Sequence, residues 1–342
     1  MKTGIAELPL HYGSCPKWLF VRMKKLSGAI AKAIVLEFGT TEFLKRISDP
    51  FFFQAFACVV GFDWHSSGTT TTLCAALKEA NLEEYGIAIC GGKGNMARKT
   101  PEEIEEKIKY VDADPEKMKY FSRIAAKVDS SCVQDGFELY HHVFIFNEKG
   151  EWSVVQQGLN QATRYARRYH WFSPKDLVNE PHTAVCCDYK TKTLNLVASE
   201  CEKTRKYITE LAKEGKENIK KLVMHSSHWF DLRKYEKSFS ALEKAYEQQP
   251  KTFEELLSIQ GIGAKALRAL ALISKLIYGS ELSWRDPVKY SFAHGGKDRV
   301  PYPVDKKLYD NSIRTLEEAI QLAKLGKREK LNALKALERL KI

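Results

Sequence analysis

The sequence predicts an α+β fold, in which a mixed α/β region with a sheet of about five strands precedes an all-helical region. The clearest sheet signal is a pair of apolar runs at 140–146 and 152–157, which flank a glycine-containing turn and predict a β-hairpin. A third apolar run, at 85–90, predicts another buried strand. Residues 200–342 contain no comparable strand pattern, so only helices are expected there.

Helices are predicted on the N-terminal side of these strands. An amphipathic pattern predicts a helix from Trp18 to Phe38 that ends at Gly39. Thr40 begins a further helix, which Pro50 interrupts because proline lacks the amide hydrogen that a helix interior needs. Another helix is predicted at 69–81, after a polar and aromatic loop bounded by glycines.

Three further segments leave more than one interpretation open. Apolar runs at 183–188 and 193–198 are separated by a short polar turn and predict a second hairpin. The segment 165–172 interleaves arginines with aromatic rings. That composition suits either a platform on which a nucleic-acid strand stacks, or a half-buried connector whose arginines face solvent.

Length and the change of pattern predict the domain organisation. A chain of 342 residues is long enough for two domains, or for one large domain with an added module. Because the strand pattern ends near Ser199, we expect a mixed α/β domain of unknown role at 1–199 and a helical domain at 200–342.

The chain is basic. Lys and Arg number 54 and Asp and Glu 43, a net charge of +11, and the pI is about 9.1. This balance favours a polyanionic partner, and the expected partner is nucleic acid, with double-stranded DNA the expected form. A solubilising surface would give the same sign of charge, so the positive charge is evidence for nucleic-acid binding mainly where it coincides with a site for phosphate.

The sequence also predicts location and cofactors. The N-terminus has no apolar signal-peptide core, and the longest apolar stretch, at 51–62, is about half of the ~20 residues that span a bilayer, so we expect a cytoplasmic protein without a membrane partner. The eight cysteines include no C-x-x-C pair. No metal or cofactor is therefore predicted, except a divalent metal if the protein is a nuclease.

The glycines at 261 and 263 mark the most informative segment. Thr252 and Glu255 fit a capping box that begins a short helix, and a longer helix follows the two glycines. Glycines at a sharp turn leave backbone amides uncovered, and with the start of the next helix they can bind one phosphate. The predicted DNA-binding residues are Gly261, Ile262, Gly263, Ala264, Lys265 and Arg268.

This segment resembles the helix-hairpin-helix motif of DNA-binding and DNA-repair proteins. An ordinary helical corner with glycine at its bend is the alternative. The region from 239 to 325 is also similar to the helix-hairpin-helix DNA glycosylase superfamily, because Pro303-Val304-Asp305 follows the glycines in the order that the superfamily has. The resemblance implies a catalytic lysine at Lys265 and a catalytic aspartate at Asp305. Lys306 departs from the threonine that is common after this aspartate.

The chemistry that the resemblance implies is base removal through a Schiff base. A partly desolvated lysine at a helix start can be a free amine that attacks C1′ of a damaged nucleotide. A carboxylate across the pocket stabilises the positive charge that develops on the sugar. Lysine can equally lie beside a phosphate, and Asp305 can be only a helix cap. The aromatic residues that can stack on an extruded base, or simply pack the loop, are Trp284, Tyr290, Phe292 and His294.

Polar residues in the N-terminal region form a rival site. They are Asp63, His65, Lys93, Lys127, Asp129, Asp135, His141, His142 and Gln156. Asp and His side chains near strand ends can bind a divalent metal for phosphodiester hydrolysis, although no nuclease signature is legible. Adjacent histidines at a strand start place one ring inward and one outward, which is usually structural.

Over its whole length the chain also resembles an uncharacterised archaeal and bacterial group, family 763 of the domains of unknown function. The matching segments include residues 61–68, 90–94, 126–129 and 155–158. Three hypotheses follow. The first is a DNA glycosylase or lyase that acts on a damaged or deaminated base, the second is a metal-dependent nuclease that uses the glycine segment as a DNA clamp, and the third is a non-catalytic nucleic-acid-binding protein.

Overall fold

The computed structural model describes residues 15–61, 67–187, 190–215, 218–219, 236–288, 306–323 and 326–338. Helices α1 (Lys17–Phe38), α2 (Thr40–Ser48), α3 (Pro50–Val59) and α4 (Ser67–Lys78) lead towards the sheet. The predicted helix ends are confirmed at Gly39, which separates α1 from α2 with φ 87°, and at Pro50, which begins α3. Asp49 caps α3, because its Oδ1 accepts the amide hydrogens of Phe51 and Phe52 at 2.7 and 3.0 Å.

The described residues form a five-stranded antiparallel sheet with the order β1-β3-β4-β5-β6. Its strands are β1 (Ile87–Lys93), β3 (Glu138–Asn147), β4 (Trp152–Asn160), β5 (Tyr165–Phe172) and β6 (Ala184–Cys186). The predicted hairpin is confirmed as β3 and β4, in which Val143 lies opposite Val155. Short elements complete this region: η1 (Glu83–Tyr85), α5 (Asn95–Arg98), a π-helical turn η2 (Val128–Cys132), β2 (Val133–Gln134), β7 (Leu194–Asn195) and η3 (Ser199–Cys201).

Two of the strand predictions are corrected. The second hairpin does not form, because β6 extends the main sheet beside β5 whereas β7 pairs with β2. The segment 165–172 is strand β5 near the edge of the sheet, and Arg167 and Arg168 are completely buried. It is therefore neither a connector with solvent-facing arginines nor an open platform for bases.

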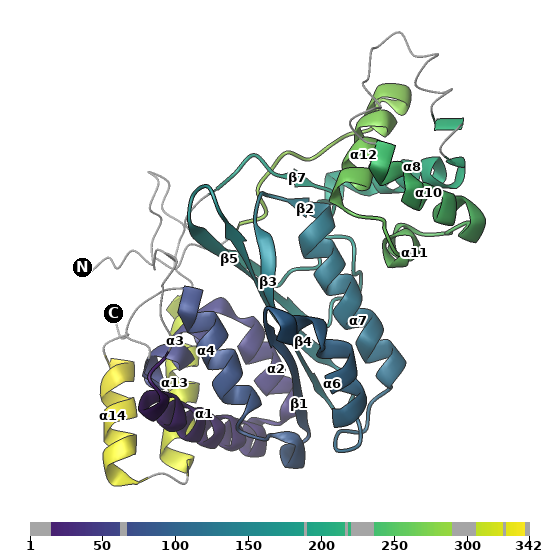
Figure 1. The fold of residues 1–342 in the computed structure, drawn as a ribbon. Helices are drawn as coiled ribbons and strands as arrows, with labels where there is room; N and C mark the ends of the chain where they lie inside the picture. The colour runs from purple at the N-terminus through teal and green to yellow at the C-terminus, as the bar shows by residue number, and fades with distance from the viewer. Residues whose placement is uncertain are drawn as a thin grey trace.

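Helices cover both faces of the sheet (Figure 1). On one face, Phe144, Phe146 and Val154 pack in the same core as α6 (Thr100–Lys107) and α7 (Pro115–Lys127). On the other face, Ile145 and Val155 pack in the core formed by α1 to α4. This alternation follows from the pleat of a strand, which sends successive side chains to opposite faces.

The helices beyond residue 200 divide into two groups. Helices α8 (Glu202–Lys213), α10 (Glu236–Gln248), α11 (Phe253–Ser258) and α12 (Ala264–Tyr278) share the core of the α7 face. Helices α13 (Lys306–Leu322) and α14 (Lys327–Glu338) instead contact α1 and α3, at the opposite end of the molecule (Figure 1). The division into domains at Ser199 stays a prediction, but α13 and α14 pack with the N-terminal helices.

None of the helices in the described ranges has both the length and the apolar character that crossing a lipid bilayer requires.

Candidate functional sites: the glycine hairpin and a basic cavity

The glycine hairpin, residues 259–263, joins α11 to α12 as the sequence predicted. Thr252 caps α11, because its Oγ1 accepts the amide hydrogen of Glu255 at 3.1 Å. The return bond of the predicted capping box is displaced by one residue, since the Glu255 carboxylate accepts from the amide of Lys251 at 2.7 Å. Gly261 has φ 98°, a conformation that side chains rarely adopt. The turn therefore depends on this first glycine.

The second glycine is different, because the fold does not require it. Gly263 has φ −138° and ψ −175°, which is extended backbone open to any residue. A Cβ atom built on Gly263 would meet nothing closer than the Gly261 carbonyl oxygen at 4.0 Å. The missing side chain consequently leaves open space in front of the first turn of α12, where the initial backbone amides have no partner within the helix.

Three hydrogen bonds attach the hairpin and the start of α12 to the sheet region. Lys127, at the end of α7, donates through Nζ to the Ile262 carbonyl oxygen. Gln134 donates through Nε2 to the Ala264 carbonyl oxygen at 2.8 Å, and its Oε1 accepts from Nε of Arg268 at 2.7 Å. Arg268 is thus engaged within the protein, whereas Lys265 is exposed to solvent.

The remaining glycosylase-like residues are placed only in part. Lys265 lies on an exposed face of α12, which does not supply the partial desolvation expected of a Schiff-base lysine. Trp284 is half-buried, with the Lys192 ammonium 5.4 Å from its ring centroid, and packs beside the core of the α7 face. Asp305, Tyr290, Phe292 and His294 lie outside the described residues.

The polar residues of the N-terminal region divide into two rows that cross the sheet on opposite faces. In the first row, the register places Lys93 opposite His141, His141 opposite Gln157, and Gln157 opposite Arg168. In the second row, His142 lies opposite Gln156, and Gln156 lies opposite Tyr169. Paired residues of an antiparallel ladder share a face, so neighbouring His141 and His142 belong to different sites.

The second row contributes a hydrogen-bonded chain on the α7 face. Gln156 donates through Nε2 to Asp129 Oδ2 at 2.6 Å, which turns its Oε1 towards His142 Nδ1 at 2.9 Å. His142 Nδ1 therefore carries the proton, and Nε2 accepts from the Ser122 hydroxyl at 2.8 Å. Asp129 also accepts from the indole of Trp171 and contacts His182. Burial lowers the pKa of His142, which keeps the ring neutral.

Asp135 lies in a separate buried ion-pair network. Its carboxylate accepts from Arg167 at 2.8 Å and from the Tyr169 hydroxyl at 2.6 Å. Arg167 also pairs with Asp286 at 2.7 Å, which connects β5 to the segment after α12. Asp135 is thus joined to Arg167 and Asp286, not to His141 or His142, so it does not assemble a metal site with the histidines.

The first row lies on the α4 face and is buried except at Lys93, which is exposed. Gln157 accepts from the Thr70 hydroxyl at 2.6 Å and donates to the Ser67 carbonyl oxygen at 2.9 Å. His141 is 1% exposed, and neither of its ring nitrogens has a hydrogen-bond partner. Burial, with the nearby charges of Lys93 and Arg168, lowers the pKa of His141 to about 3. Asp63 and His65 lie outside the described residues.

A cavity of about 590 Å³ opens where α5 and α7 approach the ends of β1 and β3. Its lining includes Ser122 and His142 from the hydrogen-bonded chain. It also includes Arg98, Arg123 and Lys127, and Lys127 is the residue that reaches the glycine hairpin. The structure therefore brings Lys127, His142 and Gln156 of the predicted rival site to one cavity that adjoins the hairpin. His141 borders this cavity from β3, but it belongs to the row on the α4 face.

Sequence reasoning missed Ser122, Arg98 and Arg123. Each belongs to a helix whose polar face looks ordinary in the sequence, and only the packing of α5 and α7 against the strand ends places them around one space. Among the described residues, no group of three or more His, Cys, Asp and Glu side chains is arranged to hold a metal ion. The metal-dependent nuclease stays a prediction without a located metal site.

A family model supplies the relationship of the chain to other proteins. The model of a protein family of unknown function, DUF763, matches residues 4–304. This chain belongs to the DUF763 family. No curated protein and no solved structure matches the chain.

The DUF763 match has a structural boundary. It includes the sheet, the basic cavity and the glycine hairpin, and it ends just before α13 begins at Lys306. The two candidate sites therefore both belong to the region that defines the family, whereas α13 and α14 lie beyond it.

Proposed function

We propose that this DUF763 protein binds nucleic acid, with the glycine hairpin contacting the phosphate backbone in the way that helix-hairpin-helix motifs do. The observation that carries the proposal is Gly263, a glycine that the backbone conformation does not require and whose missing side chain leaves the start of α12 open. A phosphate needs this close approach, because its oxygens accept from backbone amides at the N-terminus of a helix.

Charge around the hairpin supports the same partner. Lys265 is exposed in the first turn of α12, two residues after Gly263, and Lys127 contacts the hairpin by donating to the Ile262 carbonyl oxygen. The net charge of +11 adds a long-range attraction for a polyanion. Contacts of this kind are to phosphates, so they provide affinity and position without reading base sequence.

The first test replaces Gly263 by alanine. The Gly263→Ala variant is expected to keep its melting temperature, because the extended backbone accepts alanine, and to bind a DNA duplex about tenfold more weakly in fluorescence anisotropy. Lys265→Gln should weaken binding and lower the slope of log K against log salt by about 1. Lys335→Gln, on α14 at the opposite end of the molecule, is the matched control and should change neither quantity.

Two results would overturn this proposal. One is duplex affinity that is equal in wild type, Gly263→Ala and Lys265→Gln. The other is a loss of affinity in Gly263→Ala that follows a loss of folding, which would make Gly263 a structural residue only. Gly261→Ala is the reference for a structural loss. It is expected to lower the melting temperature, because φ 98° and a Cβ contact of 3.0 Å with Ala241 make that substitution strained.

Base removal is the narrower form of the proposal. The exposed amine of Lys265 is accessible to C1′ of an abasic or extruded nucleotide at the hairpin. Borohydride reduction with duplexes that carry uracil, hypoxanthine, 8-oxoguanine or an abasic site is expected to trap a covalent complex. Lys265→Arg keeps the positive charge but cannot form the Schiff base, so the complex should vanish while duplex binding persists. An absence of any trapped complex with the wild-type protein would contradict catalysis and leave binding intact.

A further inference from the structure

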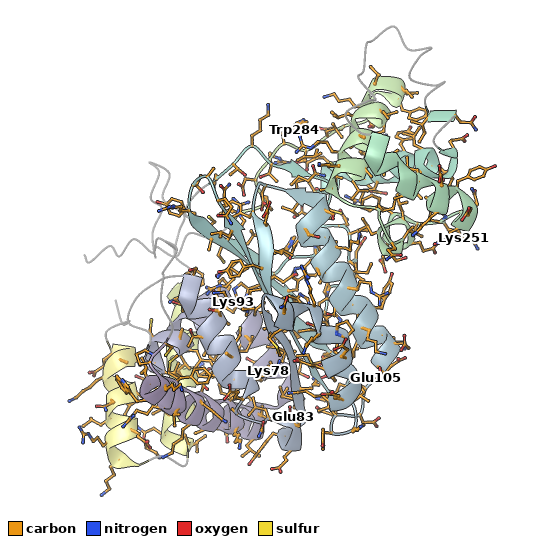
Figure 2. The ribbon with its side chains drawn as sticks, in the orientation of Figure 1. Lys78, Glu83, Lys93, Glu105, Lys251 and Trp284 are labelled. Atoms are coloured by element: carbon orange, nitrogen blue, oxygen red, sulfur yellow. The ribbon has the colours of Figure 1, made fainter. Side chains whose placement is uncertain are left out.

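Ion pairs neutralise several lysines near the basic cavity. Lys78 of α4 pairs with Glu103 at 2.6 Å, Lys107 of α6 pairs with Glu83, and Lys119 of α7 pairs with Glu105. Figure 2 labels three members of these pairs, Lys78, Glu83 and Glu105. Carboxylates of α6 and η1 thus neutralise these three lysines outside the cavity.

Within the cavity the charges are left unpaired. No ion pair or hydrogen bond joins the Arg98 or Arg123 side chain to another residue of the described ranges. Among the described residues, Lys127 contacts only the neutral carbonyl oxygen of Ile262, and burial lowers the pKa of Lys127. Of the described residues that line the cavity, none is Asp or Glu. Arg98 and Arg123 are exposed at the mouth and Lys127 is half-buried, so three cations border a concave space whose described lining has no acids, and this arrangement attracts an anion.

Polar groups on the cavity wall add hydrogen-bonding capacity. Ser122 and His142 lie at the wall with their protons fixed by the chain that ends on Asp129. His141 belongs to the row on the α4 face, so its unpartnered ring nitrogens lie on the other side of the sheet and do not contribute to this wall.

Apolar residues line the rest of the space. Leu139, Ala97, Ala126 and Pro101 supply these walls. A volume of about 590 Å³ lies in the range of small-molecule sites. The walls therefore suit a ligand that combines an anionic group with an apolar part, as a nucleotide does.

We propose that the basic cavity binds the phosphate monoester of a nucleotide, with Arg98, Arg123 and Lys127 around the phosphate and the apolar wall of Ala97, Pro101 and Leu139 beside the base. A phosphate monoester at the end of a nucleic-acid strand suits the location, because Lys127 lines the cavity and also contacts the hairpin. If the occupant is the end of a nucleic-acid strand, the inference rests on the proposed nucleic-acid binding. A free mononucleotide presents the same group and would occupy the cavity without the hairpin.

The test compares ligands that differ only in the phosphate. Calorimetry is run with inorganic phosphate, adenosine and adenosine 5′-monophosphate, and anisotropy is run with oligonucleotides carrying a 5′-phosphate, a 3′-phosphate or neither. A phosphorylated ligand is expected to bind at least tenfold more tightly than its unphosphorylated counterpart. The double variant Arg98→Gln/Arg123→Gln should remove this gain and leave the affinity for unphosphorylated strands unchanged. Arg164→Gln, which replaces an exposed arginine outside the cavity, should behave as wild type.

The outcomes separate the two proposals and the two sources of phosphate. Lys265→Gln should weaken all oligonucleotides equally and keep the phosphate gain, so a failure of the hairpin and a failure of the cavity give different patterns. If the phosphate raises affinity only for the mononucleotide, the occupant is a free nucleotide. If it raises affinity at only the 5′ or only the 3′ end of an oligonucleotide, the occupant is that end. Equal affinity for every phosphorylated and unphosphorylated pair, or a gain that survives in the double variant, overturns the cavity proposal.

Discussion

At the scale of single residues, the two adjacent histidines show how far a sequence pattern can be taken. Strand alternation correctly separates His141 from His142, since each belongs to a different row of the sheet. The expectation that one ring faces solvent is wrong, because helices cover both faces and both rings are buried. Burial on each side depends on which helices return to the sheet, which local periodicity does not encode.

Buried neutral histidines make stability depend on pH. Burial lowers the pKa of His141 to about 3, and it also lowers the pKa of His142 and of His170. Below the unfolded-state pKa of ~6.5, the unfolded chain binds protons at these histidines and the native state does not. The free energy of unfolding therefore falls as the pH drops, by about 1.4 kcal/mol per pH unit for each histidine. Urea unfolding between pH 7 and pH 5 should show this loss.

His141→Phe isolates one of these contributions. The phenyl ring replaces two buried nitrogens that have no partner, so the free energy of unfolding at pH 7 is expected to be unchanged or raised. The slope between pH 6 and pH 5 should fall by about 1.4 kcal/mol per unit, because one fewer proton is taken up on unfolding. An unchanged slope would mean that His141 titrates alike in both states.

At the scale of elements, the type of an element was more predictable than its partner. Gly39, Pro50 and the glycine turn before Trp152 correctly marked the ends of α1, α2 and β3, because these residues act through local backbone geometry. The partner of a strand depends on contacts distant in sequence, which is why β6 and β7 were wrongly joined in one hairpin. The glycine hairpin was predictable because its turn is local, whereas the cavity beside it forms only where α5, α6, α7, η2, β3 and β4 meet.

Strand β5 shows a second limit at this scale. Arginines beside aromatic residues are usually assigned to the surface, yet Arg167 is completely buried because Asp135 and Asp286 reach it from two other segments. Arg168 lies on the opposite face, 4.5 Å from the Phe53 ring centroid. Both arginines replace hydration by contacts supplied from elsewhere in the chain, and such contacts have no signature in the segment itself.

At the scale of the whole molecule, the last two helices complete the N-terminal core. Leu316, Ile320 and Leu337 are buried in the same core as the phenylalanines of α3, and Lys25 of α1 contacts Glu329 of α14 at 3.2 Å. The region matched by the family model ends before these helices. Their position in the sequence assigns these helices to a C-terminal unit, because the local sequence does not indicate that they pack against the N-terminal helices.

Packing of α13 and α14 against α1 and α3 predicts that these helices are required for stability. Leu316→Ala removes a fully buried side chain and is expected to lower the free energy of unfolding by about 2–5 kcal/mol. Leu331→Ala, on α14 with the side chain about half exposed, is the matched control and should change it by no more than ~0.5 kcal/mol. A chain truncated after residue 304 should expose the apolar faces of α1 and α3, melt at a lower temperature and aggregate, as light scattering would show. If the truncated chain melts with the wild type, or if Leu316→Ala matches Leu331→Ala, the N-terminal core is stable without these helices, and their packing contributes no measurable free energy.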